Sequence, residues 1–398
     1  MRISINKTTI YKILMLIYAF MVYPPYILSL LPEWNSFYTN VGKMAFYFGV
    51  ILLFIRLLNG RIPKIFLAIL GFTGWLLLCD LLNGISGLPP ALFEMVKILG
   101  VVCAISILYK NGKELVFFDS WSLYFDILVV TNLISLFACP NGIVYDKSIG
   151  WQPYFVIGNA NRYVFTFIID FYLNAIRTLK EKNKIGLKLY ILCVVYIVSS
   201  IKGGLSTTAL FISVLLFVAL ALNNEKIQYL AKKYIKYIVG IVITLVLCMV
   251  GGLWRTEFVQ ETLKEITGET LSFLERGYIW SNAVKLIGQS PIFGHGSVVS
   301  SYALGYGGAY RSSHNTFLQL MIYGGIPTIL VFFYCIFKTI KTSIRGLRKD
   351  LSYISTICVL LIILCFAFEQ YPFYIGIFIF MAVVFLEAHG GNIHENTI

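Results

Sequence analysis

Residues 351–368 read LSYISTICVLLIILCFAF, a run of 18 residues without a charged side chain. An α-helix rises 1.5 Å per residue, so this run spans about 27 Å, close to the ~30 Å thickness of the hydrocarbon core of a bilayer. A second apolar run, YPFYIGIFIFMAVVFLEA at 371–388, follows directly after Glu369 and Gln370. Two such runs in succession predict two membrane-spanning helices joined by a short turn.

Apolar runs of this kind recur along the whole chain of 398 residues. The chain is 58% hydrophobic and only 13% charged, with a mean hydropathy of +0.80. A soluble domain of this length needs a larger polar surface to cover its core. We therefore expect an all-α polytopic membrane protein with about 12 transmembrane helices. The expected spans are 10–30, 40–58, 63–82, 91–109, 117–138, 162–179, 187–201, 204–222, 237–254, 314–337, 351–368 and 371–388.

Lysine and arginine are concentrated in alternate connecting segments, such as those around 56–64, 177–188 and 338–349, and the opposite segments are nearly free of them. Because basic loops stay in the cytoplasm, this alternation places both termini in the cytoplasm. The same rule accounts for the net charge of +13 without nucleic-acid binding. The first apolar run lacks a small-residue cleavage site, so we interpret it as a span and not as a removed signal peptide.

This orientation places two polar segments outside, 140–161 and 255–313. The second is the longest polar stretch of the chain, and the pattern of residues 271–287 within it predicts an amphipathic helix. The chain thus divides into N-terminal transmembrane helices (1–254), a large extracytoplasmic loop containing short helices (255–313), and C-terminal transmembrane helices with a short cytoplasmic tail (314–398).

Charged residues also fall inside the expected spans, where an unpaired charge is costly. Glu94 and Lys97 are three residues apart on one expected helix and can neutralise each other. We interpret most of these charges as structural pairs. The eight cysteines form no CxxC motif, and the sequence predicts neither a disulfide framework nor a zinc site.

Basic residues are scarce on the expected outer side, so each one requires an explanation. A guanidinium group binds phosphate through two parallel hydrogen bonds and stays charged, so a cluster of them suits a lipid-linked pyrophosphate. The alternative is that these residues anchor to lipid headgroups or pair with Glu257, Glu261 or Glu275. The residues in question are Arg162, Lys202, Arg255, Arg276, Lys285 and Arg311.

His314 lies where the polar loop meets an apolar run. A neutral imidazole can accept a proton from an attacking hydroxyl group near neutral pH, which makes His314 a candidate general base. The alternative is that His314 only caps the start of the following helix, beside Ser312 and Ser313.

Several motifs of the outer loop resemble the O-antigen ligase/polymerase superfamily. They are Arg276-Gly-Tyr-Ile-Trp280, then Pro291-Ile-Phe-Gly294-His-Gly296, and then His314-Asn315 followed by Gly325 and Thr328. The ligase-type pattern is His, then Asn, Ser or Gln, nine residues, Gly, two residues, and Gly, Thr or Tyr, and this chain fits that spacing. It departs from the arginine motif, which has Leu at the position of Trp280. The segment Asn159-Ala-Asn161-Arg162 also looks like the family. The family often has Ser-Arg at the outer end of the next pair of spans. This chain has Ser200-Ile-Lys202 near that place, so Lys202 would replace the family's arginine.

The resemblance implies a GT-C-like glycosyltransferase on the outer face of the bacterial cytoplasmic membrane, with undecaprenyl-pyrophosphate-linked glycans as donor and acceptor. Arg276 and His314 would be the catalytic residues, with His314 as the base of an inverting displacement. No cofactor or metal is expected, and a chain-length regulator is a possible partner. The pyrophosphate would be held by Arg162, Lys202, Arg311 and Arg255. Further substrate contacts would come from Asn315, Trp280 and Asn161.

Three functions remain open. The first is a polymerase that joins lipid-linked repeat units into O-antigen or capsule chains, which the composition rich in Ile, Phe, Tyr, Lys and Asn favours. The second is a ligase that transfers finished glycan to lipid A-core or another acceptor. The third is a flippase for lipid-linked oligosaccharides, but a transporter is expected to contain internal repeats, and the sequence contains none.

Overall fold

The computed structural model describes residues 6–58, 64–85, 89–146, 152–203, 206–250, 256–257, 261–262, 265, 271–298, 303–305 and 312–390. The expected site residues Arg255 and Arg311 lie outside these ranges.

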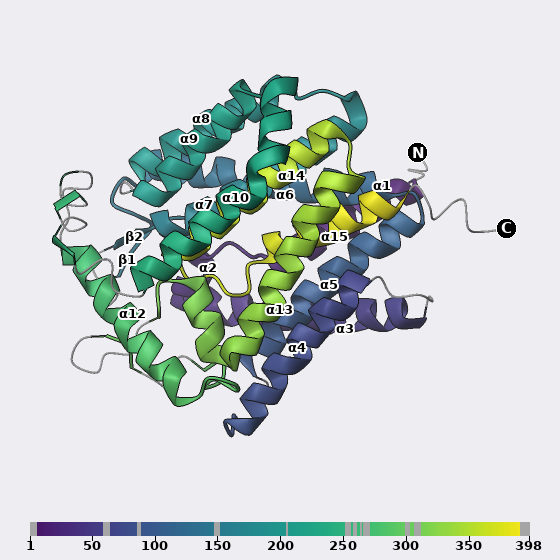
Figure 1. Ribbon diagram of the computed structural model, residues 1–398. Coiled ribbons are helices and arrows are strands. Elements are labelled where there is room, and N and C mark those ends of the chain that lie inside the picture. Colours follow the sequence, from purple (N-terminus) through teal and green to yellow (C-terminus); the bar gives the residue numbers. More distant parts are fainter. Residues whose placement is uncertain are drawn as a thin grey trace.

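The described chain is almost entirely helical, in agreement with the predicted all-α class (Figure 1). Two three-residue strands, β1 (Val144–Asp146) and β2 (Gln152–Tyr154), pair in antiparallel register and are an addition to the predicted fold. The helices are α1 (Lys7–Val22), α2 (Ile27–Leu30), α3 (Pro32–Leu58), α4 (Lys64–Leu82), α5 (Pro90–Lys110), α6 (Glu114–Ala138), α7 (Ala160–Lys182), α8 (Leu187–Lys202), α9 (Thr207–Ala221), α10 (Glu225–Val250), α12 (Leu271–Gln289), α13 (Thr316–Gly346), α14 (Lys349–Phe368) and α15 (Ile375–Gly390).

Six described helices are long and apolar enough to cross a membrane: α3, α4, α5, α6, α13 and α14. Two shorter apolar helices, α9 and the segment Ile375–His389 of α15, add to them. The protein is therefore an all-α membrane protein with several spans. Each expected span overlaps a helix, but the full number of twelve crossings stays a prediction.

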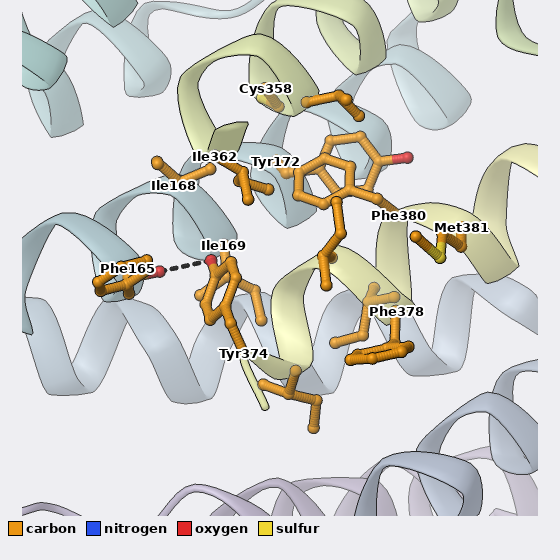
Figure 2. Packing of buried hydrophobic residues seen from close by; sticks show 14 of the residues in the cluster. Phe165, Ile168, Ile169, Tyr172, Cys358, Ile362, Tyr374, Phe378, Phe380 and Met381 are labelled. Carbon is orange, nitrogen blue, oxygen red and sulfur yellow. Dashed lines mark hydrogen bonds between the residues drawn. The ribbon is translucent and has the colours of Figure 1, made fainter. Parts of the chain in front are cut away.

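Helix α7 forms the centre of the core and is buried over most of its length. Its side chains pack against α14 and α15, and Figure 2 shows Phe165 and Tyr172 of α7 among Ile362, Tyr374 and Phe380. The Tyr374 hydroxyl group donates a hydrogen bond to the Phe165 carbonyl oxygen at 2.6 Å. Helix α7 is the most polar of the expected spans by sequence. The fold tolerates this polarity because polar residues such as Asp170 and Asn174 face protein and not lipid.

Several charged residues inside the bundle have an ion-pair or hydrogen-bond partner, as the sequence predicted for most of them. Lys97 and Glu94 form an ion pair at 2.7 Å. Asp170 accepts hydrogen bonds from Tyr196 at 2.8 Å and from Asn174 at 2.8 Å. These contacts compensate the cost of removing charged groups from water.

The described parts of the two segments expected outside lie on one side of the bundle. In the view of Figure 1, β1, β2 and α12 lie at the left, whereas the start of α1 and the end of α15 lie at the right. Residues 271–287 are helical as predicted, within α12. The fold therefore places α12, which carries Arg276, away from the start of α1 and the end of α15.

Candidate functional site

The N-terminus of α13 carries the histidine motif and is fixed by its neighbours. Asn315 is the N-cap residue, and its side-chain oxygen accepts a hydrogen bond from the Leu318 amide at 3.0 Å. Its side-chain amide donates to the Ala367 carbonyl oxygen at 2.9 Å. The Thr316 hydroxyl group donates to the Glu369 carbonyl oxygen at 2.8 Å. The start of α13 is thereby attached to the end of α14.

His314 directly precedes this cap and is half-buried. Its φ of 47° lies in the left-handed region, which costs a residue other than glycine about 1–2 kcal/mol. Such strain persists where the surrounding contacts impose it, and it is often found at functional sites. The capping role considered for His314 from the sequence is wrong, because Asn315 is the residue that caps α13.

Helix α13 is interrupted at Gly324 and Gly325, at the point where the loop 291–297 docks on it. Gly325 has a φ of 72°, and a Cβ there would overlap the carbonyl oxygens of Ile292 and Pro291. Only glycine satisfies both conditions without strain. The docking of this loop therefore explains why the motif that begins at His314 has glycine at position 325.

The loop also replaces the helical hydrogen bonds that the interruption removes. Pro327 has no N–H group, so the Tyr323 carbonyl oxygen accepts from the Gly296 amide instead, at 3.1 Å. The Ile322 carbonyl oxygen accepts from the His295 amide at 2.7 Å, and the Ile326 amide donates to the Pro291 carbonyl oxygen at 2.8 Å. Since buried backbone groups need partners, the interruption and the loop stabilise each other.

The same loop is attached to α4. The Ser297 amide and hydroxyl groups donate to the two carboxylate oxygens of Asp80, at 2.6 and 2.9 Å. The Trp75 indole N–H donates to the Gly324 carbonyl oxygen at 2.7 Å. The motif Pro291–Gly296 thus stabilises the N-terminal part of α13 through hydrogen bonds.

Arg276 extends from α12 to the end of α14. One guanidinium nitrogen donates to the Phe368 carbonyl oxygen at 3.1 Å, and another lies 3.5 Å from Oε1 of Glu369. Asn315, Arg276 and Thr316 therefore bind three consecutive carbonyl oxygens, those of residues 367, 368 and 369. Helix ends leave such carbonyl groups without intrahelical partners, so these contacts join Arg276 and the His314 segment to one turn.

The acidic partner of Arg276 is Glu369 in the α14–α15 turn. The sequence suggested Glu257, Glu261 or Glu275, which are near Arg276 in the chain. Burial raises the pKa of the Glu369 carboxyl group to about 7, against the opposing effect of the nearby Arg276 charge. A carboxyl group in this range changes its charge close to physiological pH, which alters how strongly Arg276 is held.

Arg162 lines a cavity of about 520 Å³, and residues 370–373, which directly follow Glu369, line the same cavity. The guanidinium carbon of Arg162 lies 3.7 Å from the centre of the Tyr26 ring and 5.7 Å from that of Tyr371. Among the described residues, no carboxylate forms a salt bridge with Arg162. A guanidinium group held by aromatic rings and facing a cavity is suited to an anion.

The other expected site residues are placed as follows. Lys202 is exposed at the end of α8, with its ammonium nitrogen 5.8 Å from the centre of the Phe137 ring. Asn161 lies half-buried in the first turn of α7. Trp280 is 1% exposed and belongs to the core, and Asn315 is fully buried in its capping role. The structure shows that Trp280 packs in the core and that Asn315 caps α13. Substrate contacts by these two residues stay predictions.

The tyrosines that surround Arg162 were not identified as site residues from the sequence. Tyr23, Tyr26, Tyr38 and Tyr371 line the cavity from three separate segments of the chain. The pair Tyr23-Pro-Pro-Tyr26 between two helices was the available signal. Within the described ranges, no three His, Cys, Asp or Glu side chains come together as metal ligands would.

Comparison with known protein families matches residues 186–333 to the family described as O-antigen ligase. This segment begins at α8 and ends within α13, so it contains Arg276 and His314 but not Arg162. No curated protein and no solved structure matches the chain. Residues 186–333 of this helical membrane protein are thus similar to the O-antigen ligase family, which confirms the resemblance that the sequence motifs indicated.

Proposed function

We propose that this protein is a polysaccharide polymerase, which joins undecaprenyl-pyrophosphate-linked repeat units on the outer face of the cytoplasmic membrane. The observation that carries the proposal is the convergence on one turn: Arg276 binds the Phe368 carbonyl oxygen, and the residues after His314 bind the carbonyl oxygens on either side of it. The Arg162 cavity opens beside the same turn, through Gln370 and Tyr371.

The basic residues bind the pyrophosphate of the donor. Among the described residues, half-buried Arg276 contacts one carbonyl oxygen and a carboxylate at 3.5 Å, and a phosphate oxygen competes well with both. Negative charge builds up on the pyrophosphate as the glycosidic bond breaks. A fixed guanidinium group stabilises that charge without reorganisation.

His314 acts as the general base. It takes the proton from a hydroxyl group of the acceptor sugar, and the resulting oxygen nucleophile attacks the anomeric carbon of the donor. The new carbon–oxygen bond forms as the bond between the anomeric carbon and the phosphate oxygen breaks. Undecaprenyl pyrophosphate leaves, and a single displacement inverts the anomeric configuration. The strained left-handed backbone at residue 314 supports this assignment, because such strain is often found at functional sites.

A ligase is the second candidate, and one observation favours it. The matched family is described as O-antigen ligase, and the sequence His314-Asn315 fits the ligase form of the motif. The ligase reaction would use the same kind of lipid-linked donor and the same base as the polymerase reaction. Its acceptor hydroxyl group would belong to a different molecule, such as lipid A-core. The chemistry at Arg276 and His314 therefore supports both reactions.

The experiment that separates them is glycan analysis in a deletion strain, complemented with the wild-type protein or with His314→Ala. Surface glycan is resolved on a gel, and lipid-linked intermediates are extracted in parallel. A polymerase predicts surface molecules that carry one repeat unit without a ladder, and a ladder that only the wild-type protein restores.

The other outcomes are distinct. Long chains that stay on the undecaprenyl carrier identify a ligase. Single repeat units retained on the inner face identify a flippase and contradict both transferase proposals. If His314→Ala restores the ladder, His314 is not the general base, but the proposal of a polymerase is not contradicted.

A further inference from the structure

The backbone at His314 is held by hydrogen bonds on both sides. Its neighbours Ser313 and Asn315 are each 0% exposed, whereas His314 itself is half-buried. The Ser313 hydroxyl group donates to the Asn315 carbonyl oxygen at 2.6 Å, across residue 314. The Ser313 amide donates to Oε1 of Gln319 at 3.0 Å. Strained backbone persists where the surrounding contacts leave it no alternative, and these bonds are such contacts for the left-handed residue 314.

Gln319 reaches this segment because of its place in the helix. It is the fourth residue of α13 and is 0% exposed. In a helix the Cα–Cβ bonds point toward the N-terminus, so its side chain extends back over the first turn. A capping box uses similar geometry, with Glu or Gln at the third helical position binding the amide of the N-cap residue. Gln319 instead binds the amide of Ser313, two residues before the cap Asn315, and the bond therefore closes around His314.

The same face of α13 continues to the wall of the Arg162 cavity. Tyr323 follows Gln319 by about one helical turn, is 4% exposed and lines that cavity. The side chains of Gln319 and Gln370 lie within hydrogen-bonding reach of the Tyr323 hydroxyl group, and Gln370 also lines the cavity. Gln319 thus lies between the His314 segment and the cavity.

The N-terminal part of α13, residues 316–323, is attached to other elements at both ends. At its start the Thr316 hydroxyl group donates to the Glu369 carbonyl oxygen at 2.8 Å. At its end the Tyr323 carbonyl oxygen accepts from the Gly296 amide at 3.1 Å. A helix held at both ends is a rigid support for a side chain that positions a catalytic group.

We infer that Gln319 is the positioning residue of His314, and that its bond to the Ser313 amide fixes the imidazole relative to the cavity wall at Tyr323. Gln319 acts through the backbone of residues 313 and 314. The inference rests on the proposed function for the role of His314 as the base. Because a displacement of about 1 Å can cost about 100-fold in rate, removal of this bond should slow the chemical step without weakening substrate binding.

The first test compares Gln319→Met with Gln319→Glu. Methionine has a similar length and only a poor acceptor, whereas glutamate keeps a carboxyl oxygen for the Ser313 amide. The purified full-length proteins in detergent extend the lipid-linked repeat units that are extracted from the deletion strain. We expect Gln319→Met to lower kcat by about 10- to 100-fold with KM changed by less than about twofold. Gln319→Glu should restore most of the wild-type kcat.

A double variant shows whether Gln319 acts through His314. His314→Ala removes the base, so the addition of Gln319→Met should not lower the residual rate further. A residue that acts independently lowers the rate by the same factor in both backgrounds. The control is Thr339→Val, which removes a buried hydroxyl group bonded to the Cys335 carbonyl oxygen farther along α13. This control should retain the wild-type kcat.

A second readout does not depend on glycan synthesis. Diethyl pyrocarbonate modifies neutral, accessible imidazole groups, and mass spectrometry measures the extent at each histidine. His295 and His314 are both half-buried, so His295 is the internal reference. We expect Gln319→Met to speed the modification of His314 by at least about threefold, because its segment opens more often, and to leave His295 unchanged.

Equal acceleration at His295 and His314, or an equal loss of rate in the wild-type and His314→Ala backgrounds, would overturn the inference. If the wild-type protein extends the repeat units and Gln319→Met does so at the wild-type rate, the inference fails and the polymerase stands. If the wild-type protein does not extend them, the polymerase proposal fails, and the modification rates still decide whether Gln319 holds His314.

Discussion

Arg276 and Asn315 bind adjacent carbonyl oxygens at the end of α14, those of Phe368 and Ala367, at 3.1 and 2.9 Å. The two residues are far apart in the sequence, and each belongs to a different motif of the long loop. The end of α14 therefore sets the distance between Arg276 and the histidine before Asn315. A change in this turn is expected to act on both residues together.

Replacement of Arg276 by lysine should lower polymer synthesis by about a hundredfold or more, because a single ammonium group cannot bind a carbonyl oxygen and a phosphate in fixed geometry. The measurement is the rate of glycan chain formation in membranes with equal amounts of protein. Lys285→Ala, at an exposed position on the same helix, is the control and should retain the wild-type rate. A fully active Arg276→Lys protein would exclude a bidentate role.

His314→Gly should abolish polymerisation, with a loss of about 10²–10⁴-fold for the missing base, although glycine fits the left-handed backbone at this position better than histidine does. The glycine variant separates chemistry from strain, since it should be at least as stable as the wild-type protein. The measurement combines product length with the thermal unfolding temperature. Activity retained in His314→Gly would show that the backbone, and not the imidazole, matters here.

His295→Ala is the matched test for the other histidine of the loop. Its imidazole Nε2 bonds with the Leu286 carbonyl oxygen at 2.8 Å, so its role is structural. We expect a loss of about 1 kcal/mol in stability with activity retained per folded molecule. Loss of activity without loss of stability would place His295 in the reaction.

Gly325→Ala should destabilise the protein by more than about 2 kcal/mol, because the left-handed backbone disfavours alanine and the new methyl group meets the carbonyl oxygen of Ile292. Thermal unfolding in detergent micelles measures the change. Gly74→Ala is the control, at an exposed position of α4 where a Cβ contacts nothing within 4 Å. That variant should be neutral or more stable by up to about 1 kcal/mol.

The Glu369→Gln variant should gain stability relative to the wild-type protein as the pH rises from 4.5 to about 7. The carboxyl group has a raised pKa of about 7 in the folded protein and its ordinary value of 4.5 in the unfolded chain. The folded state therefore binds the extra proton, and wild-type stability falls through this window. The full effect is roughly 3 kcal/mol and remains constant above pH 7. Unfolding temperatures of both proteins from pH 4.5 to 8 measure it, and parallel curves would contradict the assignment.

The sequence by itself determined the class of the fold and the resemblance of residues 186–333 to a family. Long apolar runs have one stable solution in a bilayer, because backbone groups must be hydrogen-bonded within the helix, so the positions of the helices followed from hydropathy. The family motifs were also readable, because Arg276, His314, Asn315, Gly325 and Thr328 are defined by residue type and spacing. The helix at residues 271–287 was also predicted from its pattern, but its buried face was not, because Ile279, Trp280, Ala283 and Ile287 are buried while Tyr278 and Val284 are exposed.

Only the tertiary structure decided what those residues contact. Asn315 caps α13, and the absence of a side chain at Gly325 allows the loop at Ile292 to pack against α13. The local hydrophobic periodicity predicts neither contact. Glu369 is the partner of Arg276 although closer acidic residues precede it in the chain, because the side chain of Arg276 extends from α12 to the end of α14. The cavity around Arg162 combines tyrosines from three segments, and their meeting depends on helix packing, which hydropathy does not encode.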